Sequence, residues 1–277
     1  MPVKRSTKKL DPIAAPPVPA GVHELGETGL KRSGGRILEE FLKEFKGPRR
    51  FKMLTEMIDN EPLISGTYFA IRQLIKQAEW VVKPASDSSQ DKANAEFVES
   101  CLHDMSSSWT DTIDEILSFV PYGFSVHEIV YKYRMGPQHT DSMFRSNQKD
   151  GKIGWRKLPI RAQETLETWN IDPSGGILGV TQRSDYSAKA ANIYLPIQKM
   201  LLFRTTSFKN NPEGRSIFRA SYVPYYYKKR IQVHEAIGIE RELNGIPKAK
   251  VPGRIMSATA TADEKAAYEG YKNTVRN

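Results

Sequence analysis

The sequence predicts an α+β fold in which helices come first, strands follow and one long helix comes last. Three observations lead to this prediction. Apolar side chains recur at helical spacing from Pro62, the pattern changes to a period of two after Gly123, and a helical run ends at Leu243. The chain has 277 residues, of which 39% are hydrophobic, so it is long enough to bury a core of its own.

The first 35 residues predict a flexible arm. Prolines, which disfavour helix, occur at Pro12, Pro16, Pro17 and Pro19, and glycines follow them. Two interpretations remain open: a disordered tail, or an arm that becomes ordered against a neighbouring subunit. A short helix is expected next, over residues 35–45.

A clear helix is predicted from Pro62 to Glu79, because proline suits the first position of a helix. Its apolar face, which we expect to be buried, comprises Ile64, Tyr68, Ile71 and Ile75.

A short strand is expected at Trp80–Val82, where Pro84 ends it. Two further helices are predicted over Ala93–Met105 and Asp111–Phe119, the second of them capped by Thr110.

Strands dominate the next part of the chain. From Gly123 to Tyr131 the side chains follow a period of two, which predicts one continuous strand. Further strands are expected over residues 158–171, 177–181 and 199–205. The turn-forming residues Asp172–Gly176 predict a hairpin between two of these strands.

The long helix is predicted to start at Asn211-Pro212-Glu213, where an asparagine cap precedes a proline and an acid. Pro224 is expected to kink or restart it, and Gly245 and Pro247 to end it after Leu243. Its apolar residues do not share one stripe, which indicates contacts with neighbouring copies as well as with its own domain.

Positive charge gathers on this helix and its flanks, although the whole chain has a net charge of only +9. Tyrosines interleave with the basic residues, a combination that suits phosphate contacts and stacking on nucleic acid, or equally a solvated helix with packed tyrosines. The candidate residues for a subunit interface or a DNA channel are Tyr225, Tyr226, Lys228, Lys229, Arg230, Arg241, Lys248 and Lys250.

Motifs of catalysis are absent from the sequence. It has no phosphate-binding loop, no His-Glu-x-x-His, no Cys-x-x-Cys and no Gly-x-Ser-x-Gly, and its five histidines lack metal-ligand spacing. Its single cysteine, Cys101, allows no intrachain disulfide. We therefore expect no catalytic residues, no metal and no cofactor.

Several segments, in order, are similar to portal proteins of tailed bacteriophages. They are Asn60–Ile64, Glu79–Pro84, Tyr122–Tyr131, Trp169–Asp172, Gly176–Gln182, Leu195–Pro196, Asn211–Ser216, Glu240–Arg241 and Asn244–Pro247. Their order and spacing over residues 53–250 carry the resemblance. One departure is Glu213, which stands where the family often has an aromatic residue.

The resemblance implies a portal-type wing of helices and mainly antiparallel strands, followed by a stem helix. The boundaries we expect are an arm at 1–35, a wing at 36–210, a stem helix region at 211–245 and the start of a clip at 246–277. Family chains continue into a second stem helix and a crown, so we expect this chain to be a partial subunit.

The resemblance also implies a function without catalysis. Such subunits usually form a twelve-membered ring at one capsid vertex, the channel for packaging and ejecting DNA. The partners it implies are terminase, a head-tail adaptor, capsid and scaffold proteins, and double-stranded DNA bound without sequence specificity. The implied location is the portal vertex of the virion, with assembly in the host cytoplasm and no membrane contact.

Two other classes of protein fit the composition. One is a DNA-processing enzyme, such as a metal-dependent nuclease, whose carboxylates converge only in the fold. The other is a monomeric, basic nucleic-acid-binding module. Light scattering would separate these from a portal, because only the portal should form large rings.

Overall fold

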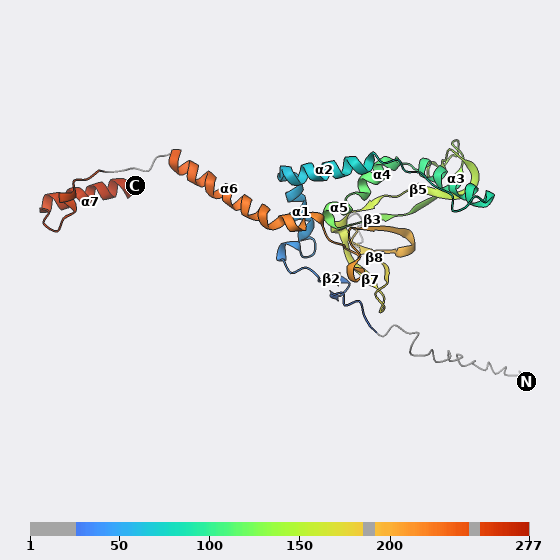
Figure 1. Ribbon diagram of the computed structural model, residues 1–277, viewed down its shortest axis with the longest axis horizontal. Coiled ribbons are helices and arrows are strands. Elements are labelled where there is room, and N and C mark those ends of the chain that lie inside the picture. Colours follow the sequence, from blue (N-terminus) through green and yellow to red (C-terminus); the bar gives the residue numbers. More distant parts are fainter. Residues whose placement is uncertain (1–25, 185–191, 244–249, 277) are drawn as a thin grey trace, which may run out of the picture. The chain divides into compact units, whose positions relative to one another are not determined.

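The computed structural model describes residues 26–184, 192–243 and 250–276 (Figure 1). The chain divides into two compact units, one ending at Ala220 and the other comprising residues 221–277. These are called unit 1 and unit 2 below. Unit 1 mixes helices with antiparallel strands, so the predicted α+β class is confirmed.

The α-helices of unit 1 precede most of its strands, as predicted. The helices are α1 (Arg49–Asn60), α2 (Pro62–Lys76), α3 (Ser89–His103), α4 (Trp109–Ile116) and α5 (Phe119–Tyr122). Pro62 occupies the start of α2 as expected. Helix α1 was not predicted, although Phe51, Leu54 and Met57 recur at every third position and are buried.

Three local predictions at the N-terminal side of unit 1 are wrong. Residues 35–45 form no α-helix, because Gly34 and Gly35 have positive φ and turn the chain into a hairpin of β1 (Arg32–Ser33) and β2 (Arg36–Ile37). Residues 80–82 form no strand; Trp80 stands edge-on to Trp109 with ring centroids 6.0 Å apart. The cap of α4 is Ser108, whose hydroxyl accepts from the Asp111 amide at 3.0 Å.

The strands of unit 1 form small antiparallel sheets. The remaining strands are β3 (Phe124–Glu128), β4 (Val130–Met135), β5 (Lys149–Lys157), β6 (Ile160–Arg161), β7 (Leu166–Ile171), β8 (Ile177–Gln182), β9 (Ile193–Pro196) and β10 (Met200–Arg204). Their orders are β10-β3-β6, β4-β5 and β7-β8-β9, beside the β1-β2 pair. The predicted hairpin at Asp172–Gly176 joins β7 to β8 and is confirmed.

The strand predicted from Gly123 to Tyr131 is two strands. It breaks at Ile129, after which β4 leaves the three-stranded sheet and pairs with β5. Strand β3 is buried on both faces, since Ser125 and His127 are as inaccessible as Phe124 and Val126. The predicted strand over 158–171 is likewise interrupted, by a short 3-10 helix between β6 and β7.

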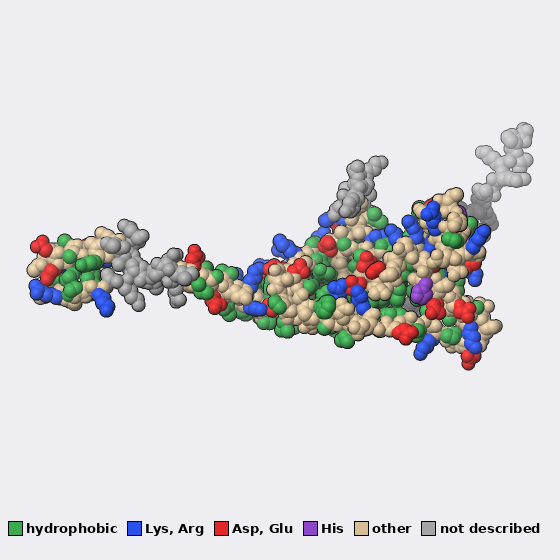
Figure 2. Space-filling view, turned by 90° about the horizontal axis from the view of Figure 1, so that it is seen from above, with side chains coloured by type: hydrophobic (Ala, Val, Ile, Leu, Met, Phe, Trp, Pro, Cys, Tyr) green, Lys and Arg blue, Asp and Glu red, His purple; other side chains and the backbone are tan. Residues whose placement is uncertain are grey.

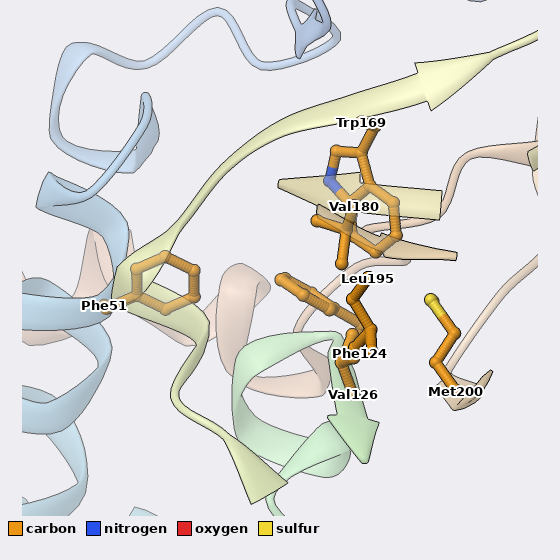
Figure 3. Close-up of a cluster of buried hydrophobic side chains, with 7 residues drawn as sticks. All are labelled: Phe51, Phe124, Val126, Trp169, Val180, Leu195 and Met200. Atoms are coloured by element: carbon orange, nitrogen blue, oxygen red, sulfur yellow. The ribbon is translucent and has the colours of Figure 1, made fainter. Parts of the chain in front are cut away.

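Two apolar clusters form the core of unit 1. The larger one joins α1, β3 and the β7-β8-β9 sheet, as Figure 3 shows, through Phe51, Phe124, Val126, Trp169, Val180, Leu195 and Met200. The smaller one centres on Ile113, Ile116, Leu117 and Val120 of the α4–α5 region. Of the predicted face of α2, Ile64 is buried, Tyr68 and Ile75 pack half-buried on the smaller cluster, and Ile71 is half-buried.

Unit 2 consists of α6 (Tyr222–Leu243), a short 3-10 helix and α7 (Ala262–Arg276). The predicted start of the long helix at Asn211 is wrong. Pro212 and Glu213 form a turn, Gly214 has φ +52°, and α6 begins only after a 3-10 helix over Ile217–Ser221. Pro224 lies in the first turn of α6, where its missing N–H needs no partner. The predicted stop residues Gly245 and Pro247 lie outside the described residues.

Candidate subunit interface on the long helix

Helix α6 carries most of the candidate residues that the sequence singles out. Tyr225, Tyr226, Arg241 and the basic run from Lys228 to Arg230 all lie on it. Lys250 is exposed in the segment between α6 and α7. Lys248 falls outside the described residues. The structure therefore brings the candidates together along one helix, not into a pocket.

The first turns of α6 hold a cluster of aromatic rings. The ring of Tyr226 lies 6.1 Å from that of Tyr222 and 5.8 Å from that of Tyr227, measured between centroids. The guanidinium of Arg230 lies 5.0 Å above the Tyr226 ring, a cation–π contact that partly occupies this face of the tyrosine. Tyr225 is buried, whereas Tyr226 and Tyr227 are exposed. Only the exposed tyrosines remain available for contacts outside the chain.

Beyond Tyr225, every described side chain of α6 is exposed. The large apolar ones are included: Ile231 is 62% exposed, Val233 53% and Ile239 53%. Figure 2 shows hydrophobic side chains at the surface along this helix. At about 100° per residue, Ile231 and Val233 point about 160° apart, so these side chains do not share a stripe, as predicted.

Charge is distributed unevenly along α6. Lys228, Lys229 and Arg230 lie in its N-terminal half, while Glu235 and Glu240 lie in its C-terminal half, where Arg241 is the one basic residue. An isolated helix gains from the opposite arrangement, with acids near its N-terminus and bases near its C-terminus. The arrangement therefore does not serve the stability of the helix by itself, and it marks a surface suited to a charged partner.

The last residues of unit 1, which lead into α6, are held by an ion pair and aromatic rings. Arg219 donates to both carboxylate oxygens of Glu40 at 2.8 Å, and its guanidinium lies 4.9 Å above the Phe45 ring. The hydrogen bond from Arg219 lowers the pKa of Glu40 to about 2. Phe218 is buried with its ring edge-on to Tyr68. We call this set of contacts, together with those of Glu213 below, the mount.

Glu213 accepts two hydrogen bonds within unit 1. Arg50 donates to one carboxylate oxygen at 2.5 Å, and the indole N–H of Trp169 donates to the other at 3.1 Å. The Arg50 guanidinium also lies 4.5 Å above the Phe51 ring. The residue that departs from the family pattern thus has full partners, which link α1 to β7 and to the turn before α6.

Two glycines allow the turn of the mount to approach β3. Gly123 has φ +92° and Gly214 φ +52°. A Cβ built on Gly214 would lie 2.2 Å from the carbonyl oxygen of Gly123, and one on Gly123 would lie 2.7 Å from that of Glu213. Neither position can carry a side chain without moving the backbone of the other segment.

The contacts of the mount were missed by sequence reasoning. Arg219 and Glu40 are 179 positions apart, and Arg50 and Glu213 are 163 apart, so no local pattern connects them. The only available signal was Glu213 itself, an acidic residue next to Pro212. The structure shows that Pro212 is fully buried.

The groups with potential for catalysis do not converge in the described part of the chain. No group of three or more His, Cys, Asp or Glu side chains there could hold a metal ion. Burial lowers the pKa of His127, whose Nδ1 lies 2.9 Å from the Leu158 carbonyl oxygen. The neighbouring Glu128 pairs with Arg161. Among the same described residues, no helix is both long and apolar enough to cross a membrane.

The fold and the long helix define a class of protein in which an α+β unit is followed by a long helix that does not pack into a hydrophobic core of its own. Residues 51–272 match the family described as the portal protein of Mu bacteriophage. The match covers most of the chain, including α6, and the chain belongs to this family of phage portal proteins. The resemblance inferred from the sequence motifs is thereby confirmed. The family is structural and not catalytic, and membership implies association with the virion.

Proposed function

We propose that this chain is a subunit of a ring at one capsid vertex, through which phage DNA enters during packaging and leaves during ejection. One observation carries the proposal beyond family membership. Helix α6 exposes Ile231, Val233 and Ile239 to solvent on more than one side of the helix, and large apolar side chains exposed in this way suit contacts with more than one neighbour.

The regions of the proposed subunit follow from the sequence. Residues 36–210 form the wing, 211–245 the stem helix region and 246–277 the start of the clip, with an arm at 1–35. Glu213 and Arg219 tie the segment before α6 to α1 and to Glu40, so the first residues of the proposed stem region pack on the wing, and the free part of the stem begins with α6. The ring would have about twelve subunits, in line with the family resemblance.

The partners of the ring are also part of the proposal. Terminase and a head-tail adaptor dock on it, capsid and scaffold proteins surround it, and double-stranded DNA passes through it. A channel for any DNA sequence gains nothing from contacts with base edges, so its charge acts on phosphates and depends strongly on salt. The subunit has no catalysis of its own.

The main role we propose for α6 is contact with neighbouring subunits. Within the described part of the chain, the α6 side chains from Tyr226 to Arg241 are all exposed, which suits cover by other chains or by DNA. The apolar side chains favour a protein neighbour, because phosphates offer them nothing to bury against. A lining of the DNA channel by Lys228, Lys229 and Arg230 is the second candidate, supported by their charge.

The first experiment measures the mass of the purified protein by size-exclusion chromatography with light scattering. We expect rings of about twelve subunits; a monodisperse monomer across a range of concentration and salt would contradict the proposal.

The second experiment replaces Lys228, Lys229 and Arg230 by glutamate together. Loss of rings with an unchanged circular dichroism spectrum supports the interface role. Normal rings with reduced packaging would assign these residues to the channel instead.

A further inference from the structure

Helix α2 has a second apolar face that its own unit leaves uncovered. Leu63 is 77% exposed and Leu74 71% exposed, with Gly66 and Ala70 exposed between them. At about 100° per residue these four side chains fall within about 80° of one another, on the side away from buried Ile64. A helix on the surface of a single core has one apolar face, so the second one needs an occupant.

The uncovered face of α2 is also free of charge. Its other members, Thr67, Gln73 and Gln77, are neutral, and the only charged residues in α2 are Arg72 and Lys76, both of which pair with Asp114 of α4. Solvent-facing sides of helices normally carry charged residues. The face therefore has the composition of a contact surface.

Helix α6 presents a face with the same spacing. Ile231, His234 and Gly238 follow one another at intervals of three and four residues, as Leu63, Gly66 and Ala70 do in α2. Tyr227, 61% exposed, extends this face by one turn. At about 100° per residue the four positions of α6 fall within about 60°.

Each of the two faces contains a glycine that its own chain does not require. A Cβ at Gly66 or at Gly238 would meet no atom within 4 Å. Glycine inside a helix costs about 1 kcal/mol relative to alanine, and neither position has positive φ. A missing side chain does, however, allow a second helix to approach closely.

The distribution of charge favours one relative direction of the two helices. Glu61 directly precedes α2 and Asp59 lies in the last turn of α1, while the basic run Lys228–Arg230 lies in the N-terminal half of α6. A parallel arrangement places these opposite charges together. With Leu63 opposite Ile231, the equal spacing puts Ala70 opposite Gly238 and brings Lys228 and Arg230 level with the acidic end.

We propose that the uncharged face of α2 receives the Gly238 face of α6 from a neighbouring copy of this chain, with the two helices parallel. The inference rests on the proposed ring, and it names the surfaces that join its subunits. The contact is heterologous, since each copy offers α6 to one neighbour and α2 to the other. Repetition of such a contact closes a ring when the rotation between copies allows it.

The test uses disulfide crosslinking, since the one native cysteine, Cys101, is buried. Ala70→Cys and Gly238→Cys are made as separate proteins and as a double variant, and are oxidised after assembly. We expect crosslinked dimers from the mixture of the two single variants and a ladder of higher species from the double variant. A disulfide requires Cα atoms within about 7 Å, so it reports direct helix contact.

Matched controls separate the possible outcomes. Val233→Cys replaces Gly238→Cys on another side of α6 and should not crosslink to Ala70→Cys. Dimers from Gly238→Cys alone would mean that α6 pairs with α6, and dimers from Ala70→Cys alone that α2 pairs with α2; either result overturns the inference. Rings without the Ala70–Gly238 crosslink overturn it while leaving the proposed function intact. Absence of rings in the unsubstituted protein overturns both.

A second variant covers the case in which the cysteines disturb assembly. Ala70→Trp fills the face of α2 without touching the core, and Ala93→Trp places the same side chain on the exposed side of α3. We expect both to keep the urea midpoint of the unsubstituted protein, and only Ala70→Trp to lose the rings. Rings that tolerate Ala70→Trp would contradict the docking of a helix at this face.

Discussion

The larger core of unit 1 and the helix α6 are built from the same kinds of side chain in opposite environments. Phe124 and Val126 in β3 are at most 1% exposed, whereas Ile231 and Val233 in α6 are more than half exposed. Apolar composition therefore does not tell which residues fold the chain. Burial within one chain separates residues that stabilise its fold from residues that remain exposed and that we propose for contacts with other chains.

The larger core of unit 1 and helix α6 also differ in the free energy that they gain from burial. The core of unit 1 removes aromatic and aliphatic side chains from water, which contributes about 1.5–3 kcal/mol for each fully buried residue. An exposed helix gains almost nothing of this kind, and most of the stability of helices in proteins comes from packing of an apolar face. Folding of unit 1 should thus be independent of assembly, while the order of α6 should increase on assembly.

The strongest test of the comparison removes the centre of the larger core. Phe124→Ala deletes a ring whose centroid lies 6.2 Å from that of Phe51 and 5.7 Å from that of Trp169. The free energy of unfolding should fall by about 3–5 kcal/mol. Urea denaturation followed by circular dichroism measures it, and a loss below 1 kcal/mol would mean that the cluster is not the core.

The next largest effect should come from the mount. Glu213→Gln removes the charge that Arg50 faces and leaves a largely buried guanidinium without its counter-ion. We expect a loss of about 1–3 kcal/mol in the free energy of unfolding. Lys272→Ala, which breaks an exposed ion pair with Glu269, is the control and should change stability by less than about 0.5 kcal/mol. Equal effects of the two substitutions would show that the mount is not a structural centre.

A smaller effect concerns acid stability. The hydrogen bond from Arg219 lowers the pKa of Glu40 from 4.5 to about 2, so folding favours the ionised carboxylate. This contribution is present above pH 4.5 and is lost as the pH falls toward 2. Glu40→Gln should therefore flatten the decline in the unfolding midpoint of unit 1 over this range. A decline as steep as in the unsubstituted protein would exclude Glu40 as its source.

The smallest effect on the single chain is expected in α6. Ile231→Ala removes an exposed side chain and should shift the free energy of unfolding by no more than about 0.5 kcal/mol. Light scattering at limiting protein concentration should nevertheless show weaker assembly. A large loss of stability in the monomer would mean that α6 belongs to the core, and the contrast drawn above would fail.

What the sequence could predict depended on the range of the interactions involved. Pro62 and the Ile64 face located α2, and Asp172–Gly176 located the β7–β8 hairpin, because both signals lie within a few neighbouring residues. The long helix was found from its C-terminal part, but its start was misplaced, since the positive φ of Gly214 depends on the approach of Gly123. A distant segment decided that local conformation.

The candidate site shows the same division. Tyr226 and Arg230 were singled out from composition, and the structure brings them into contact on α6. The two-sided burial of β3 could not be predicted from alternation, because Ser125 and His127 read as the polar side of a strand. Each makes a hydrogen bond with a backbone carbonyl in the interior: Ser125 with that of Ile116, and His127 with that of Leu158.

The mount also sets an order of events during synthesis. Its two ion pairs join residues 163 and 179 positions apart, so they cannot form until almost all of unit 1 has left the ribosome. Contacts at such separation are slow to form, because a long loop must close before they add stability. Helix α6 is translated immediately afterwards. The last contacts of unit 1 therefore become possible just as the chain reaches the helix that we propose for subunit contacts, and a shorter nascent chain cannot associate through a helix that it still lacks.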